Sequence, residues 1–217
     1  MGPSLASFGV PAPLANPTLY LFDHTGALIA ANDNWKDTQQ AQIQATGLAP
    51  PNNLDAAILI TLSPGAYTVF LQGKAMATGI GLAEVYDVDP SANAQPTNLS
   101  ARAFVGTGND VLIGVRSSGG NGASLQRALV RALGPSLAST GIATPLAIRR
   151  SHRAMPTATS SLIMTTGRIR SRQLLRRLAR HLRTILNALL APGNYTAIVA
   201  GKNGTTGVAL IEFYSLP

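Results

Sequence analysis

A six-residue motif occurs twice in this 217-residue chain, and the register between its copies constrains the fold more than any other feature. The sequence GPSLAS at 2–7 returns at 134–139, a spacing of 132 residues. Further along, PGAYT at 64–68 matches PGNYT at 192–196, a spacing of 128. A fixed period indicates two copies of one structural unit. About four residues are missing from the second copy between the two motifs.

Short apolar or alternating runs between turn residues predict β-strands in both copies. In the first copy they are 18–22, 27–31, 56–62, 67–72 and 79–86. Three more runs lie before the second GPSLAS motif, at 99–105, 111–116 and 128–133. A full repeat therefore has about eight strands, which predicts an all-β, two-sheet, jelly-roll-like sandwich. The first copy, residues 1–97, lacks the three opening strands, so we expect an exposed edge there. The second copy spans 98–217.

The composition agrees with an all-β protein that has a real core. Hydrophobic residues make up 46% of the chain and charged residues only 12%, with 21 glycines and 14 prolines for turns. The absence of cysteine excludes disulfides and thiolate metal sites. The longest apolar runs are too short to span a bilayer, and the first residues lack the pattern of a signal peptide. We therefore expect neither a transmembrane segment nor a signal peptide in this sequence.

The net charge of +8 comes from one segment. Residues 148–190 contain ten of the 17 basic residues and none of the nine acidic ones, so the rest of the chain has a net charge of −2. Leucines and arginines alternate there with a helical period, which predicts a basic amphipathic helix at about 171–190. Such a helix would bind nucleic acid or an anionic membrane through Arg172, Arg176, Arg177, Arg180 and Arg183.

A frameshift explains this segment better than an evolved helix does. In a shifted reading, the last base of the Met164 codon joins the first two bases of the Thr165 codon to give GAC, an aspartate, as at Asp33. Continued through residue 172, the shifted codons permit the sequence of residues 33–40, each 132 positions away. We therefore interpret 148–190 as a disruption by a nucleotide insertion or deletion after Ala147, and expect no evolved nucleic-acid partner.

The sequence also resembles known modules over nearly the whole chain. The stretches PTLYLFDHTGALIAANDNW, TLSPGAYTVFLQGK, GIGLAEVYDVDP and RALVRALGPSLA resemble a tandem module of large bacterial surface and secreted proteins. The pattern of an LYLFD strand, a glycine turn, an NDNW loop and a PGAYT hairpin is similar to bacterial pre-peptidase C-terminal domains. The resemblance implies a β-sandwich, an extracellular or cell-surface location, and neighbouring repeats or domains of a larger protein as partners. It implies an accessory module rather than a catalyst.

Two features of the first copy suggest a ligand-binding alternative. Asp23, Asn32, Asp33, Asn34 and Asp37 offer oxygen atoms of the kind that calcium prefers, although their spacing is not that of an EF-hand. The other interpretation is that these side chains bond to the backbone of turns. Trp35 is a candidate platform for stacking a sugar, or else it packs against its own sheet. A carbohydrate- or calcium-binding module is therefore the alternative function, with calcium as the one cofactor considered.

No catalytic set is visible in the sequence. His24 is the one histidine outside the basic segment, and a nucleophile with its base has no obvious members. The glycine clusters at 106–108 and 119–122 lack the Lys-Ser/Thr of a phosphate loop. We expect a non-catalytic spacer, adhesion or accessory module. The alternatives are the carbohydrate- or calcium-binding module and the basic-helix binder.

Overall fold

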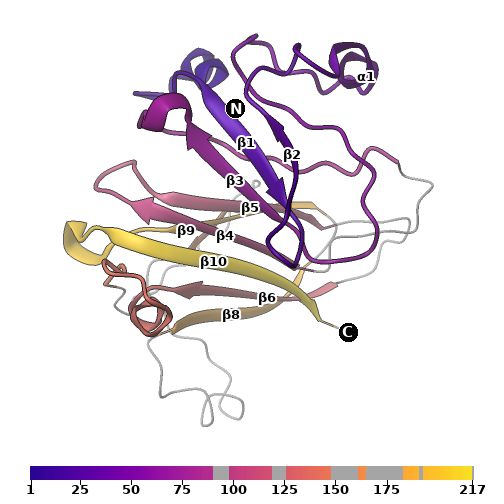
Figure 1. Ribbon diagram of the computed structural model, residues 1–217. Coiled ribbons are helices and arrows are strands. Elements are labelled where there is room, and N and C mark those ends of the chain that lie inside the picture. Colours follow the sequence, from indigo (N-terminus) through magenta and orange to yellow (C-terminus); the bar gives the residue numbers. More distant parts are fainter. Residues whose placement is uncertain (90–97, 119–125, 148–160, 165–182, 191–192, 217) are drawn as a thin grey trace. The chain divides into compact units, whose positions relative to one another are not determined.

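The computed structural model consists of two compact units, Met1–Gln95 (unit 1) and Pro96–Pro217 (unit 2) (Figure 1). The structure describes residues 1–89, 98–118, 126–147, 161–164, 183–190 and 193–216. Strands make up most of the described part of unit 2, unit 1 contains three strands, and the described helices are short. The all-β class predicted from the sequence is confirmed.

Unit 1 contains one three-stranded antiparallel sheet with the order β2-β1-β3. Its strands are β1 (Pro17–Phe22), β2 (Leu28–Asn32) and β3 (Thr68–Gly73). Short helices flank the sheet: η1 (Pro3–Phe8), α1 (Gln40–Ala45) and η2 (Lys74–Met76). The strands expected at 18–22, 27–31 and 67–72 therefore form, each within a residue or so of its predicted bounds.

Unit 2 contains a four-stranded sheet, β4-β10-β6-β8, and a three-stranded sheet, β5-β9-β7. The four-stranded sheet is antiparallel and consists of β4 (Asn98–Val105), β10 (Gly207–Leu216), β6 (Gln126–Leu133) and β8 (Arg183–Leu190). The three-stranded sheet consists of β5 (Leu112–Ser118), β9 (Gly193–Val199) and β7 (Ser161–Met164), with β7 parallel to β9. Two short helices complete the unit: η3 (Pro135–Thr140) and η4 (Lys202–Gly204).

One core cluster in unit 2 draws on both of its sheets. Phe213 of β10, Val130 of β6 and Val199 of β9 belong to it, and each is at most 2% exposed. Gly114 of β5 permits a close approach, because a Cβ there would lie 2.6 Å from the Phe213 ring. Alternate residues of β10 point into this core, as a period of two requires.

Two predicted strands of the first copy do not form. Residues 56–62 have no strand assignment, and residues 79–86 make only an isolated bridge between Ile80 and Pro13. Their counterparts at the spacing of 128 lie in β8 and β10, and both of these pair with β6. Unit 1 has no strand equivalent to β6 among its described residues, so the alternating sequences lack the backbone partner that a strand requires.

The helix expected at about 171–190 is wrong over its last eight residues. Residues 183–190 form β8, which pairs antiparallel with β6 from Leu133 opposite Arg183 to Gln126 opposite Leu190. Pairing with an existing sheet satisfies the backbone of this segment and overrides its helical pattern. Residues 171–182 lie outside the described residues, as does most of the disrupted segment 148–190.

The repeated motifs adopt the same local structure in both units. Gly2, before η1, has φ −137° and ψ −79°, and Gly134, before η3, has φ −136° and ψ −85°. Both short helices end at a glycine with positive φ, 74° at Gly9 and 86° at Gly141. Each left-handed position suits glycine, which has no Cβ to clash.

A second contact recurs between matched positions, with a spacing of 132 between its donors and of 128 between its acceptors. The Leu14 amide donates to the Ile80 carbonyl at 2.8 Å, and the Leu146 amide donates to the Val208 carbonyl at 2.8 Å. The glycine just before each acceptor is needed, because a Cβ on Gly79 would lie 2.7 Å from Leu14 Cα, and one on Gly207 would lie 2.8 Å from Leu146 Cα. The two units therefore share hydrogen bonds as well as sequence.

Candidate functional site

A buried carboxylate holds the first GPSLAS turn in unit 1. Asp55 is fully buried, and its Oδ1 accepts a hydrogen bond from the Gly2 amide at 2.6 Å. Its Oδ2 accepts a hydrogen bond from the Ser4 hydroxyl, and its carbonyl accepts the Trp35 amide at 2.9 Å. Charge-assisted bonds of this kind are among the stronger ones in proteins. Through its carboxylate and its backbone carbonyl, Asp55 therefore joins three separate stretches of unit 1 and is a structural anchor.

The loop after β2 is held by its own polar side chains. Asn32 is 8% exposed; its Nδ2 donates to the Asn34 carbonyl at 3.0 Å, and its Oδ1 accepts the Ala57 amide at 3.1 Å. Asn34 Nδ2 donates to Asp37 Oδ2 at 3.1 Å. Asp33 forms an ion pair with Lys74. All four candidate calcium ligands in this loop thus make structural contacts, although the buried Asn34 Oδ1 has no hydrogen-bond partner among the described residues.

Asp23, the fifth candidate ligand, stabilises the turn between β1 and β2. Its Oδ1 accepts hydrogen bonds from the Thr25 amide at 2.8 Å, the Thr25 hydroxyl at 2.6 Å and the Ala27 amide at 3.0 Å. The Thr25 hydroxyl bond is the main reason that the pKa of Asp23 is lowered. Within the described residues, no three His, Cys, Asp or Glu side chains gather to hold a metal ion. The structure favours the turn-stabilising interpretation of these acids.

Trp35 lies in the interior of unit 1 and not on its surface. The side chain is 4% exposed, and its Nε1 donates to the Asn52 carbonyl at 3.1 Å. The Lys36 ammonium lies 5.2 Å from the ring centroid, within cation–π range. Stacking a sugar requires an open ring face, and this ring is covered. The carbohydrate platform suggested for Trp35 is therefore replaced by a packing role.

An open cleft of about 460 Å³ lies on one face of the unit 1 sheet. Thr18 and Tyr20 of β1 and Gln72 of β3 line it, beside Asp33 and Lys74. Its two charged lining residues neutralise each other in the exposed Asp33–Lys74 ion pair, whose contribution to stability is small. The Asp33 hydrogen bond raises the pKa of Lys74, which keeps the amine protonated. Nothing in this lining activates a nucleophile.

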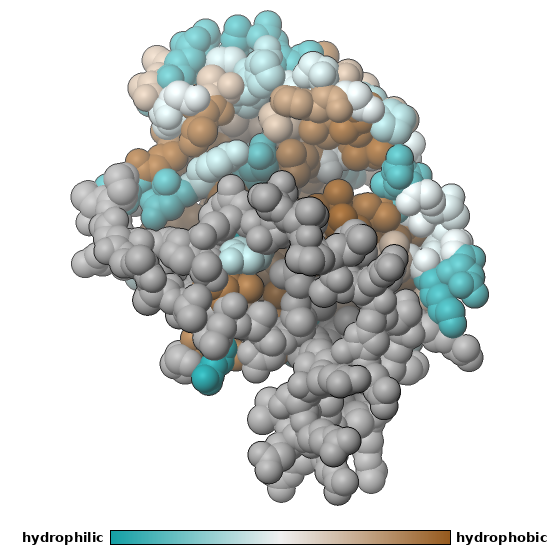
Figure 2. All heavy atoms as spheres, turned by 180° about the vertical axis from the view of Figure 1, so that it is seen from behind, coloured by the Kyte–Doolittle hydropathy of each residue, from teal (hydrophilic) through white to brown (hydrophobic). Residues whose placement is uncertain are grey.

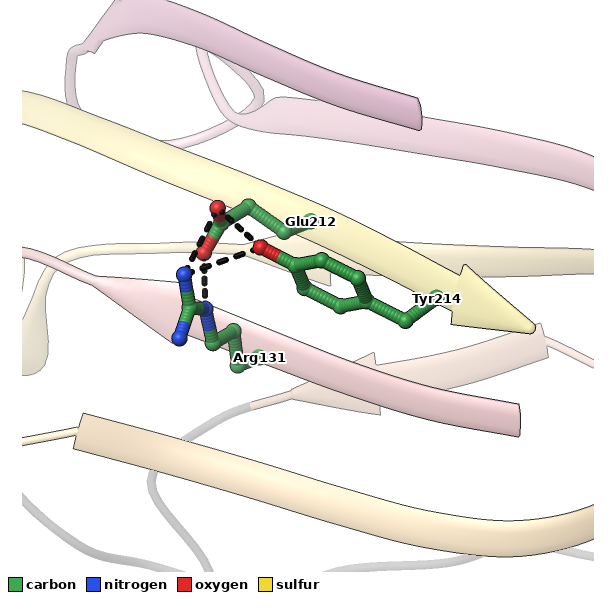
Figure 3. Close-up of polar contacts among 3 residues, drawn as sticks. All are labelled: Arg131, Glu212 and Tyr214. Atoms are coloured by element: carbon green, nitrogen blue, oxygen red, sulfur yellow. Dashed lines mark hydrogen bonds and ion pairs between the residues drawn. The ribbon is translucent and has the colours of Figure 1, made fainter. Parts of the chain in front are cut away.

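The densest polar cluster of unit 2 lies across β6 and β10. Arg131 donates to both carboxylate oxygens of Glu212, with Nη2 to Oε1 at 2.9 Å, and also to the Tyr214 hydroxyl at 2.9 Å (Figure 3). The Tyr214 hydroxyl donates to Glu212 Oε1 at 2.7 Å, and the Arg131 guanidinium lies 5.1 Å from the Tyr214 ring centroid. Arg131 and Glu212 are directly opposite in the strand register. This cluster joins the two strands and presents no free acid or base.

A partial copy of this cluster exists in unit 1. Glu84 and Tyr86 match Glu212 and Tyr214 at the spacing of 128, and the Tyr86 hydroxyl donates to Glu84 Oε1 at 2.9 Å. This bond raises the pKa of Tyr86, whereas partial burial is the main cause of the raised pKa of Tyr214. Among the described residues, no arginine pairs with Glu84.

Most of the arginines proposed for nucleic-acid or membrane binding lie outside the described residues. Arg172, Arg176, Arg177 and Arg180 lie outside the described residues, and Arg183 is the first residue of β8. For the residues that the structure covers, no helix combines the length and apolar character that a membrane span needs. No family model, curated protein or solved structure matches the chain.

Sequence reasoning missed the two best-built polar contacts. Asp55 lies directly before the apolar run AAILI, and nothing there signals its role as an anchor. The Glu-x-Tyr pattern did carry a signal, because it recurs at the repeat spacing and places both side chains on one face of a strand. Its arginine partner is not a sequence neighbour, so the cluster appears only in the fold.

Proposed function

We propose that this chain is a non-catalytic repeat module of an extracellular bacterial protein, acting as a spacer, adhesion or accessory domain. Each repeat would be an eight-stranded, two-sheet sandwich related to pre-peptidase C-terminal domains. The observation that carries the proposal is that the two units hold complementary parts of one strand set. The resemblance described above supports the location at the cell surface or in the medium.

The strand sets combine as follows. Strand β3 of unit 1 and β9 of unit 2 are the same repeat position, since PGAYT and PGNYT lead into them. In unit 1 this strand borders β1 and then β2, and in unit 2 it borders β5. Joined at the common strand, the order is β5-β9-β1-β2, four strands to place against β4-β10-β6-β8. The core that unites both sheets of unit 2 supports this sandwich.

We propose that the second repeat lacks the strand that corresponds to β1. The counterpart of β1 at a spacing of 132 falls within 149–154, outside the described residues, and a parallel β7 borders β9 instead. This is the segment that reads as frameshifted. In this proposal, unit 1 is a repeat without its opening strands, and unit 2 is a repeat whose middle segment is frameshifted.

A tandem of frame-restored repeats tests this function directly. Small-angle X-ray scattering of one, two and three repeats should show an elongated particle whose maximum dimension grows by a constant step per repeat, as a spacer requires. Fractionation of the source cells should recover the protein at the surface or in the medium. A particle that does not lengthen with added repeats, or a protein confined to the cytosol, would contradict the proposal.

A further inference from the structure

Two residues of unit 1 that match buried positions of unit 2 are exposed. Val85 is 72% exposed, whereas Phe213, its counterpart in β10, is 2% exposed. Leu62 is 39% exposed, whereas Leu190, its counterpart in β8, is 8% exposed. Figure 2 shows hydrophobic residues, in brown, on the surface that is visible from that side. An apolar surface of this kind marks an interaction site.

The backbone of the segment around Val85 forms strand-like hydrogen bonds at Leu82, and the described residues just after it are not paired with another strand. The Met1 amino group donates to the Leu82 carbonyl at 2.5 Å, which matches the pairing of Leu133 with Leu210 in unit 2. Met1 therefore occupies the place of the last residue of β6. Beyond it, residues 83–88 have no strand partner among the described residues, and an unpaired edge is a template for an added strand.

We propose that this edge of unit 1, residues 55–62 and 79–88, binds an antiparallel strand with the chemistry of β6. The occupant is an opening-strand segment of the same repeat type, supplied from outside these 217 residues. It would lie between the two edge segments, as β6 lies between β8 and β10. This inference rests on the proposed function and names the partner of the incomplete repeat.

Glu84 gives the edge its specificity. In unit 2 the matching Glu212 receives two hydrogen bonds from Arg131 of β6, and its tyrosine adds a third contact. In unit 1 the Tyr86 hydroxyl already donates to the Glu84 carboxylate, and only the guanidinium of the cluster is missing. A bidentate arginine–carboxylate pair is directional, so it selects the register of the added strand. A one-residue slip would turn the arginine to the other face.

A folded second copy of this chain is a poor donor. Its β6 is a central strand, hydrogen-bonded on both sides to β10 and β8, and Ala132 and Val130 of β6 are at most 2% exposed. Releasing β6 would expose that core and break both ladders. The partner is therefore a strand that is free before it binds, as in other cases of β-strand addition.

The test uses the full chain and a synthetic peptide with the sequence of residues 124–132. The peptide stops at Ala132 because Met1 already fills the next position. Hydrogen exchange should show new protection of the amides of residues 83–88 when peptide is added. It should also protect those amides of residues 56–62 that do not already donate to Asn32 or Gln39. A peptide with alanine at the position of Arg131 should bind about tenfold more weakly, as should wild-type peptide to the Glu84→Gln protein.

Asp87→Asn is the matched control, since it removes one negative charge from the same segment at a position that faces the opposite way. It should leave the affinity within about twofold. Protection confined to unit 2, no protection at about 1 mM peptide, or equal binding of both peptides would overturn the proposal. Protection of 79–88 by self-association without peptide would also overturn it. None of these results depends on whether repeats form an elongated spacer, so the two proposals fail separately.

Discussion

The GPSLAS turn has the same backbone in both units but not the same support. In unit 1 the Ser4 hydroxyl donates to the buried carboxylate of Asp55. In unit 2 the matching Ser136 hydroxyl is buried and has no hydrogen-bond partner within the described part of the chain. At the spacing of 128, the residue in the place of Asp55 is Arg183. A buried hydroxyl without a partner costs about 1–3 kcal/mol.

We interpret the difference as a consequence of the frameshift proposed for the second repeat. The turn itself lies before the basic segment and kept its sequence, whereas its anchor falls on the last arginine of that segment. Buried side-chain polar groups usually have a hydrogen-bond partner, although Asn16 Oδ1 and Asn34 Oδ1 of unit 1 also lack one among the described residues. A nucleotide insertion or deletion that replaced the anchor and left the turn intact accounts for both observations.

The largest expected effect is a difference in stability loss between substitutions at Phe213 and at its counterpart, Val85. Phe213→Ala should destabilise unit 2 by about 3–5 kcal/mol, because a large buried side chain leaves a cavity. Val85→Ala, at the matching position of unit 1, should change stability by less than about 0.5 kcal/mol, because the side chain is exposed. Native-state hydrogen exchange of β6, β10 and the unit 1 sheet measures both. Equal losses would mean that unit 1 already has a closed core.

Removing the anchor should be nearly as damaging to unit 1. Asp55→Ala leaves the Gly2 amide and the Ser4 hydroxyl without their acceptor, and we expect a loss of about 3 kcal/mol. Trp35 is the one tryptophan of the chain, so its fluorescence during urea unfolding reports on unit 1 alone. The exposed Asp87→Asn variant serves as the charge control. A midpoint shift no larger than that of the control would show that Asp55 is not the anchor.

A matched pair of serine variants sharpens the comparison of the turns. Ser4→Ala should destabilise unit 1 by about 1–2 kcal/mol, because it removes a bond to a charged acceptor. Ser136→Ala should be neutral or slightly stabilising in unit 2, because it removes a buried hydroxyl that has no partner among the described residues. Hydrogen exchange of η1 and η3 gives both values. Equal destabilisation would require a partner for Ser136.

The smallest expected effect is a dependence on pH above about 10, the ordinary pKa of tyrosine. Partial burial raises the pKa of Tyr214 above its unfolded value, so its stabilising contribution is complete below that value. The contribution is lost as the pH rises through the folded pKa. Tyr214→Phe should reduce this alkaline loss of stability in unit 2, as followed by hydrogen exchange. An unchanged alkaline profile would contradict the assignment.

Sequence patterns predicted the strands that have partners and failed for those that do not. Alternation identified β1 and β10 because each of these strands pairs with neighbours in a sheet. The same alternation at 79–86 produced no strand. An alternating pattern predicts which face of a strand is apolar, but it does not predict whether a neighbouring strand is present to pair with it. The helical pattern at 183–190 was likewise overridden by pairing with β6.

The sequence could not decide between the site interpretations for a different reason. Asp and Asn side chains suit calcium and suit turns equally well, and only coordinates show that Asp23 and Asn32 bond to backbone groups. Burial of Trp35 depends on the loop that carries Asn52, which no local pattern predicts. Contacts between distant segments, such as Asp55 with Gly2, are a property of the fold.

Nucleotide sequencing across codons 147–190 tests the central claim most directly. The account predicts that one alternative frame contains an open stretch encoding an NDNWKDTQQ-like sequence in register with residues 32–40, followed by a return to the present frame before the PGNYT motif. A locus in which neither alternative frame encodes such a stretch would contradict it, and the arginine-rich segment would then be part of the protein's evolved design.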